Sequence, residues 1–147
     1  MKRLSAGLVL VGGILAVLNY FVAWINLAYV DGQFTSLSFR DSSVGKYVLI
    51  VGLAIVVMGV LRLVGKLANT SFATGASVLA VVLLLLAVLG IIDTAHQFHR
   101  YSDIAENAVL PAPELAAGPF FTVFAGTVAL VGAVLAQISR LLVPKSQ

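Results

Sequence analysis

The chain has 147 residues, of which 61% are hydrophobic, 10% are charged and none is cysteine. A soluble domain would carry about 25% charged residues, so the composition excludes an ordinary water-soluble fold. The absence of cysteine excludes disulfides and thiolate metal sites. The formal net charge of +3 does not indicate nucleic-acid binding, because the basic residues stand in short pairs and form no patch or stripe.

Four apolar runs divide the chain, and each approaches or exceeds the roughly 20 residues that a helix needs to cross the hydrocarbon core. They cover Ala6–Val30, Tyr47–Leu63, Phe72–Ile92 and Phe120–Val143. In lipid every backbone N–H and C=O must be paired within its own segment, which favours helices. The sequence therefore predicts one all-α membrane domain over residues 1–147, a bundle of four transmembrane helices with outer loops at 31–46 and 93–119.

The charges sort to the two sides of this predicted membrane. All six acidic residues fall within the segments 31–46 and 93–119, whereas both termini and the connection around residues 62–66 carry only basic residues. An excess of Lys and Arg in short segments marks the cytoplasmic face. The sequence therefore predicts a multi-pass protein of the cell membrane, with both termini in the cytoplasm and two acidic loops outside.

The first apolar run contains two amides, Asn19 and Asn26, which lie one heptad apart and would share one helix face. An amide in lipid needs a partner, so this face is expected to point into the bundle. In the following loop, 31–46, Ser and Thr interleave with apolar residues, which favours an extended strand or hairpin. Its Phe34 and Phe39 either cover the end of the bundle or contact a partner protein.

Small residues at helical spacing predict close packing in the second and fourth runs, because packing drives helix association in lipid. The fourth run is expected to pack tightly inside the bundle or against another protein. The predicted packing interface consists of Asn19, Asn26, Gly52, Gly59, Gly126, Ala129, Gly132, Ala133 and Ala136.

Both histidines of the chain follow the third run and stand next to carboxylates. If the helix continues past the membrane, His96 and Asp103 share one face with Asp93 and Arg100, and His99 shares an adjacent stripe with Asp103 and Glu106. Histidine and carboxylate on neighbouring turns could bind Zn²⁺, so His96, His99 and Asp103 are a candidate metal site or pH sensor. The alternative is a solvated helix that carries ion pairs. No known metal signature is present.

The segment 93–119 is too long for a plain connection, and loops of more than about 12–15 residues usually carry a function. Its apolar side chains, including Phe98 and Tyr101, indicate a surface segment that contacts a partner. Whether residues 93–106 are helical stays open at this point. Pro111 and Pro113 would end any such helix.

Several classes of membrane protein are disfavoured by what the runs lack. No ionisable side chain lies near the middle of a run, whereas transporters and pumps keep such groups deep in the membrane. The sequence contains no phosphate-binding loop and no nucleophile elbow. Haem within the membrane would need a buried histidine, which is also missing. We therefore predict no catalytic residue, no cofactor and no enzyme.

Three short features carry a resemblance to known proteins: Trp24 late in the first run, Gly45-Lys46 before the second, and Gly118-Pro119 at the start of the fourth. In this layout the chain resembles small four-span membrane proteins of GC-rich bacteria, especially actinobacteria. The plan of four spans and two outer loops is also similar to that of claudins. The first outer loop lacks the Trp-Gly-Leu-Trp motif and the paired cysteines of claudins. Neither resemblance implies an active site.

The leading hypothesis is a non-enzymatic accessory or structural subunit that binds another integral membrane protein, or copies of itself. The expected contacts are the fourth helix and the outer loops, and membrane lipids are further partners. One alternative is an oligomeric channel or small-solute pore lined by Asn19, Asn26 and Thr127. A second alternative is the metal or pH sensor at His96 and His99 on the outer face.

Overall fold

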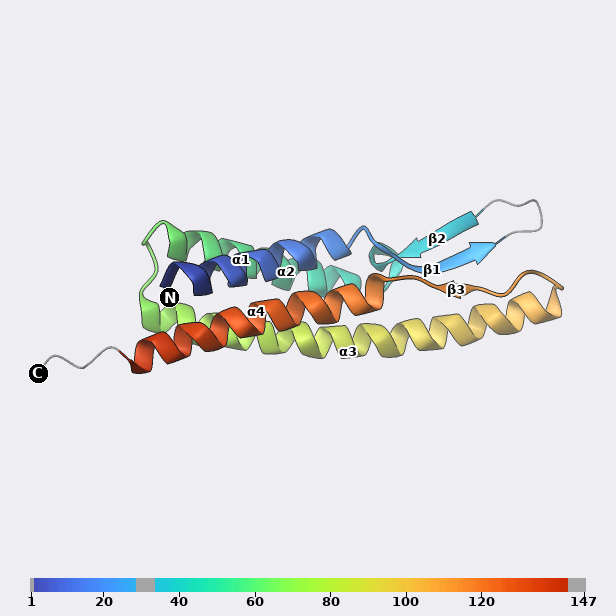
Figure 1. The fold of residues 1–147 in the computed structure, drawn as a ribbon. Coiled ribbons are helices and arrows are strands. Elements are labelled where there is room, and N and C mark those ends of the chain that lie inside the picture. The colour runs from blue at the N-terminus through green and yellow to red at the C-terminus, as the bar shows by residue number, and fades with distance from the viewer. Residues whose placement is uncertain (1, 29–33, 143–147) are drawn as a thin grey trace, which may run out of the picture.

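The structure, a computed structural model, describes residues 2–28 and 34–142. Within these ranges the chain forms four long helices and a small sheet (Figure 1). The helices are α1 (Lys2–Asn19), α2 (Gly45–Leu63), α3 (Asn69–Asn107) and α4 (Gly118–Leu141). The strands are β1 (Ala23–Ala28), β2 (Phe34–Ser38) and β3 (Glu114–Leu115), and η1 (Phe39–Asp41) is a short 3-10 helix. As predicted, all four helices are long and apolar enough to cross a membrane.

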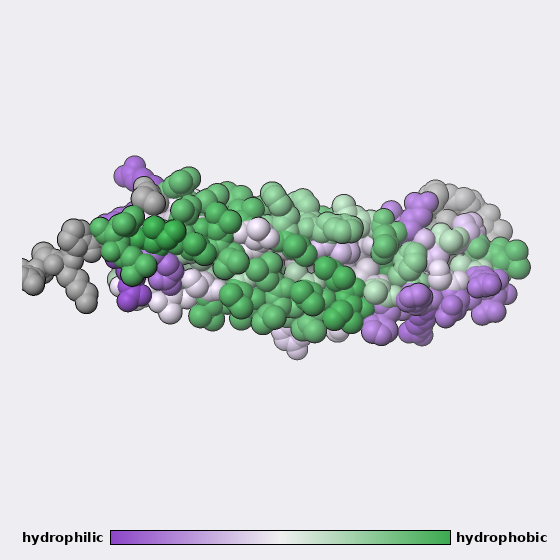
Figure 2. Space-filling model, turned by 60° about the horizontal axis from the view of Figure 1, so that its bottom comes forward, coloured by the Kyte–Doolittle hydropathy of each residue, from purple (hydrophilic) through white to green (hydrophobic). Residues whose placement is uncertain are grey.

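The four helices lie alongside one another, with the sheet at one end of the molecule (Figure 1). α1 packs against α2 and α4, and α3 packs against the same two helices. The start of α1, the α2–α3 connection and the end of α4 share the opposite end (Figure 1). We call it the basic end, because its charged residues are Lys2, Arg3, Arg62, Lys66 and Arg140. On the face shown in Figure 2, a mainly apolar surface separates two hydrophilic ends.

α1 is shorter than the first apolar run predicts. The expected helix over Ala6–Val30 is wrong beyond Asn19, because the chain turns there and residues 23–28 form β1. The 18 residues of α1 already span about 27 Å, close to the thickness of the hydrocarbon core. An apolar run by itself does not separate a helix from a buried strand. Asn19 and Asn26 therefore lie in different elements, and the prediction that they share a helix face is wrong.

α3 is much longer than a membrane crossing requires. Its 39 residues span about 58 Å, against about 30 Å for the hydrocarbon core. Residues 93–106, whose conformation the sequence left open, continue this helix to Asn107. Much of the predicted outer loop 93–119 is therefore helical, and residues 108–117 return the chain to α4.

The sheet has the strand order β2-β1-β3, and both pairings are antiparallel. Ile25 of β1 lies opposite Leu37 of β2 and Leu115 of β3. The strand predicted in the first outer loop is confirmed over 34–38, but its partner β1 comes from the run predicted as helix. The side chains of Phe34 and Phe39 lie outside the part of the chain that the structure describes.

A bulge in β1 lies where the sheet contacts the start of α4. The ladder with β2 is irregular between Ala23 and Ile25, and bulges of this kind re-aim a side chain. Trp24 lies at this point and is buried. A Cβ atom on Gly118 would overlap the Trp24 indole and would lie 2.8 Å from the Ala23 carbonyl oxygen. Glycine at position 118 therefore allows α4 to begin directly against β1.

Two consecutive glycines bring α1 close to both of its neighbours. A Cβ atom on Gly12 would lie 2.6 Å from the backbone nitrogen of Ala129 in α4. A Cβ atom on Gly13 would lie 2.8 Å from the backbone nitrogen of Val56 in α2. Real Cβ atoms essentially never approach other atoms below 3.0 Å. Both interfaces therefore depend on the absence of a side chain.

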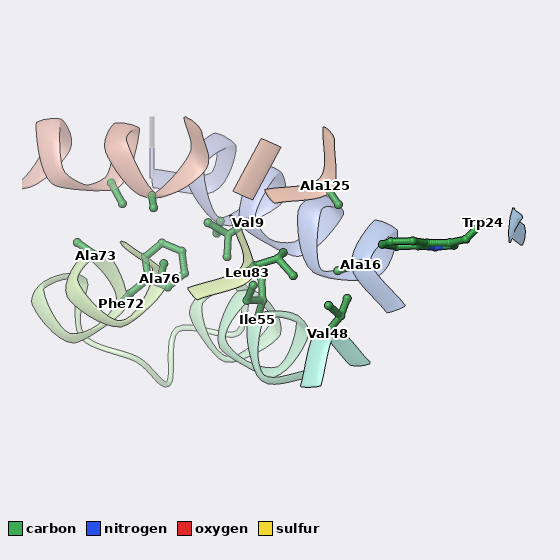
Figure 3. Close-up of a cluster of buried hydrophobic side chains, with 13 residues drawn as sticks. Val9, Ala16, Trp24, Val48, Ile55, Phe72, Ala73, Ala76, Leu83 and Ala125 are labelled. Atoms are coloured by element: carbon green, nitrogen blue, oxygen red, sulfur yellow. The ribbon is translucent and has the colours of Figure 1, made fainter. Parts of the chain in front are cut away.

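The small residues predicted to mediate packing are buried inside the molecule. On α2 and α4 they are Gly52, Gly59, Gly126, Ala129, Gly132, Ala133 and Ala136. The stripe on α4 is covered by the chain itself, since Gly132 lies against Val9 of α1 and Gly126 lies against Leu84 of α3. Larger side chains fill the remaining space between the helices, among them Val9, Val48, Ile55, Phe72 and Leu83 (Figure 3).

The close packing of α1 against α4 predicts that substitution of Gly12 destabilises the protein. Gly12→Ala is expected to lower the free energy of unfolding by about 1–3 kcal/mol, because the added methyl group meets backbone atoms. Gly7→Ala in the same helix is the matched control, since a Cβ atom there meets nothing within 4 Å. Thermal unfolding in mild detergent would measure both. Equal stability of the two variants would contradict the close approach of α1 and α4.

Candidate functional site

The end of the molecule opposite the basic end carries a folded unit beyond the apolar surface (Figures 1 and 2). It consists of β1, β2, β3, η1 and the part of α3 from Asp93 onward, and we call it the sheet module. Three of the hollows lined by described residues lie in or beside this module. The side chains predicted as sites in the segment 93–119 also belong to it. It is therefore the candidate functional region.

The first hollow, the sheet cleft, lies between the sheet and α3 and has a volume of about 160 Å³. Its lining combines carboxylates, hydroxyls, an amide and aromatic rings. The lining residues are Trp24, Ile25, Leu37, Ser38, Asp41, Ser42, Asp93, Thr94, Gln97 and Tyr101.

Two carboxylates of the sheet cleft hold the connection between β2 and α2 in place. Asp41 Oδ2 accepts hydrogen bonds from the Ser38 N–H at 3.0 Å and from the Ser38 hydroxyl at 3.1 Å. Asp93 Oδ2 accepts one from the Ser42 hydroxyl at 2.6 Å, which ties this connection to α3. The Ser42 oxygen accepts one from the Val44 N–H at 3.2 Å. Both acids therefore act as acceptors that shape the module.

The second hollow is an apolar groove where α3 and β3 meet the start of α4, with a volume of about 200 Å³. Phe98, one of the predicted contact residues, lines it together with His99. Its remaining lining is mostly aliphatic or aromatic: Ile91, Thr94, Ala95, Leu115, Pro119 and Phe120. The groove lies where the apolar helices give way to the sheet module.

The three residues of the predicted metal site do not come together. The helix that the metal hypothesis needs is present, but His96 contacts the Ile92 carbonyl oxygen at 3.1 Å and His99 lines the apolar groove. Asp103 is exposed. Across residues 2–28 and 34–142, no three His, Asp or Glu side chains are grouped so that they could hold a metal ion. The geometry therefore gives the metal hypothesis no support.

The three residues of the predicted pore occupy three different environments. Asn19 is fully buried and donates a hydrogen bond from its side-chain nitrogen to Thr122 Oγ1 of α4. Asn26 lies in the middle strand β1. Thr127 is exposed on α4, and its hydroxyl donates to the Val123 carbonyl at 2.8 Å. Sequence reasoning missed Thr122, since a single threonine in an apolar run gives no signal of its partner.

The third hollow lies beside the far end of α3 and has a volume of about 130 Å³. Tyr101, another predicted contact residue, lines it. The other lining residues are Leu27, Ile104, Ala105, Leu110, Pro111 and Pro113. We call this hollow, together with the adjacent Val109, the tip surface.

The cap that follows α3 at the tip surface contains a residue with a strained backbone. The Leu110 N–H donates to the Ala105 carbonyl at 2.8 Å and the Val109 N–H donates to the Glu106 carbonyl at 3.3 Å, which is the pattern of a Schellman cap. Val109, which follows the C-cap residue Ala108, has a φ of 55°. Glycine is usual at this position, because a Cβ there costs about 1–2 kcal/mol. Val109 is also 91% exposed.

The hydrogen bond from Ser42 to Asp93 leads to a second prediction. Asp93→Ala is expected to remove a charge-assisted hydrogen bond worth about 1.5–3 kcal/mol. Amide hydrogen exchange across residues 38–44 should then become at least about tenfold faster, because local opening is easier. Asp103→Ala removes an exposed carboxylate from the same helix and serves as the control. Unchanged exchange in Asp93→Ala would show that this bond does not hold the connection.

Comparison with known proteins places the chain in no family. No protein-family model matches the sequence, and no curated protein matches it. The geometry of the sheet module and of the two ends of the molecule is therefore the basis on which a function can be assigned.

Proposed function

We propose that this protein is a non-enzymatic accessory subunit of the cell membrane that binds another integral membrane protein, or a second copy of itself, through the tip surface. In this proposal the four helices form a transmembrane bundle, both termini are cytoplasmic and the sheet module lies outside. All six acidic residues lie on the predicted outer side, and the predicted cytoplasmic segments carry only basic residues, which supports this orientation. The observation that carries the proposed binding role is the strained backbone and exposed side chain of Val109.

Val109 combines two unfavourable features that a single substitution would remove. Its left-handed backbone is strained for a β-branched residue, and its apolar side chain is 91% exposed. Glycine would complete the same helix cap with neither cost. Strained residues that persist at an exposed position point to a functional constraint. Contact with a partner would bury this side chain and so account for valine at position 109.

The surroundings of Val109 fit the same role. Residues 93–107 of α3 extend about 22 Å beyond the predicted end of the membrane crossing. At that distance from lipid, an exposed apolar side chain faces water, and neighbouring ones mark an interaction surface. Ile104 is 49% exposed, and the adjacent hollow of about 130 Å³ has room for one side chain of a partner.

The tip surface also replaces part of the earlier expectation. The sequence favoured binding through the fourth helix and the outer loops together. The small residues of α4 are already covered by α1 and α3, so they do not supply an external contact. The proposal therefore places the partner on the sheet module, where Tyr101 lines the tip surface.

Substitution of Val109 tests the proposal. The protein would be extracted from its native membrane in mild detergent and its co-purifying proteins would be weighed by native mass spectrometry. The wild type is expected to retain a membrane protein or a second copy, and Val109→Gly is expected to lose it. Val109→Ile keeps an exposed apolar group and should retain the partner.

Stability separates loss of binding from loss of folding. Val109→Gly is expected to raise the free energy of unfolding by about 1 kcal/mol, because the strain of a β-branched residue at positive φ is removed. A variant that is more stable but has lost its partner would support a binding role for the valine. A wild type that remains a lone monomer, or a Val109→Gly variant that keeps its partner, would refute the proposal.

A further inference from the structure

The basic end contains a cavity of about 200 Å³ between the start of α1 and the end of α2. Three of its lining side chains are cationic, and the others are small or apolar. The lining residues are Lys2, Arg3, Ala6, Arg62, Leu63 and Gly65. We call it the basic cavity. It lies at the opposite end from the tip surface and has no part in the function proposed above.

Arg62 is held in position by the chain. Its Nη1 donates to the Leu67 carbonyl at 2.7 Å and its Nη2 donates to Asn69 Oδ1 at 3.0 Å. The guanidinium carbon also lies 5.8 Å from the centre of the Phe72 ring. A guanidinium has five N–H donors, and these two bonds leave three. Arg62 is therefore fixed beside the basic cavity with donors to spare.

Lys2 and Arg3 add two more positive charges, and the described part of the chain places no acidic side chain beside them. Both side chains are exposed on the first turn of α1, which has no acidic residue. All six acidic residues of the sequence lie between residues 31 and 114, and those that the structure describes belong to the sheet module or its connections. Among the described residues, no carboxylate therefore lies beside the three cations of the basic cavity.

The position and lining of the basic cavity indicate which anion fits. It lies at the ends of two helices that are long and apolar enough to cross a membrane, at the level where lipid headgroups would lie. Ala6 and Leu63 supply an apolar side. Arginine recognises phosphate through paired N–H donors, and basic pockets between membrane helices bind anionic headgroups. We infer that the basic cavity binds the phosphate of an anionic phospholipid.

Lipid retention after purification tests this assignment. Purified protein would be mixed with phosphatidylglycerol or with phosphatidylcholine of the same acyl chains, and bound lipid would be counted by native mass spectrometry. Phosphatidylglycerol is expected to bind preferentially. Arg3→Gln should weaken that binding about fivefold, and Lys2→Gln/Arg3→Gln should weaken it further. These exposed positions are chosen because Arg62 also supports the fold.

Arg140→Gln is the matched control, since Arg140 is an exposed cation on the last turn of α4 at the same end and does not line the basic cavity. Its affinity for phosphatidylglycerol should stay within about twofold of the wild type. If Arg140→Gln and Arg3→Gln weaken phosphatidylglycerol binding equally, the lipid is attracted by the general positive potential of this end and not by the basic cavity. That result would overturn the assignment. Equal binding of phosphatidylcholine would overturn it as well.

A separate measurement distinguishes binding of a lipid from binding of a free anion. Phosphatidylglycerol is expected to raise the melting temperature of the wild type, because a ligand that binds only the folded state stabilises it. Inorganic phosphate alone should produce no comparable rise, since it lacks chains to contact Ala6 and Leu63. An equal rise with inorganic phosphate would assign the basic cavity to a soluble anion instead of a lipid.

Discussion

The close approach of α1 to two neighbouring backbones is the constraint on which the rest of the molecule depends. Lipid provides little hydrophobic drive for helices to associate, so their contact must come from packing and hydrogen bonds. Gly12 faces α4 and Gly13 faces α2, and the buried hydrogen bond from Asn19 to Thr122 joins α1 to α4 again near the sheet. Because α1 ends at Asn19, the chain that follows is free to become the central strand β1.

The sheet module is built on this arrangement. β1 pairs with β2 on one side and β3 on the other, so it connects the segments before α2 and before α4. Trp24 and Gly118 hold this sheet against the start of α4, and the hydrogen bond from Ser42 to Asp93 ties the connection between β2 and α2 to α3. Each of these contacts joins residues far apart in sequence, and together they give the module its fixed position at the end of the helices.

Sequence patterns predicted four helices that are long and apolar enough to cross a membrane, because length and apolar composition are what a membrane selects. They also identified the small residues of α2 and α4 that are buried in the structure. They missed β1, since Ala23–Ala28 is as apolar as the helix before it and its strand partners lie elsewhere in the chain. Because β1 was predicted as helix, Asn19 and Asn26 were also wrongly placed on one helix face. The strain at Val109 depends on a backbone angle, and no residue pattern revealed it.

In the proposed transmembrane orientation, the continuity of α3 would connect the sheet module mechanically to the bilayer. A single helix runs from Asn69 near the basic end to Asn107 at the tip surface, and no proline interrupts it. Helices respond to the thickness of the surrounding bilayer by changing their tilt. For a segment that extends about 22 Å past the membrane, a tilt change of about 10° moves its end by about 4 Å. In the proposed transmembrane orientation, a change in the tilt of α3 would therefore also move the tip surface.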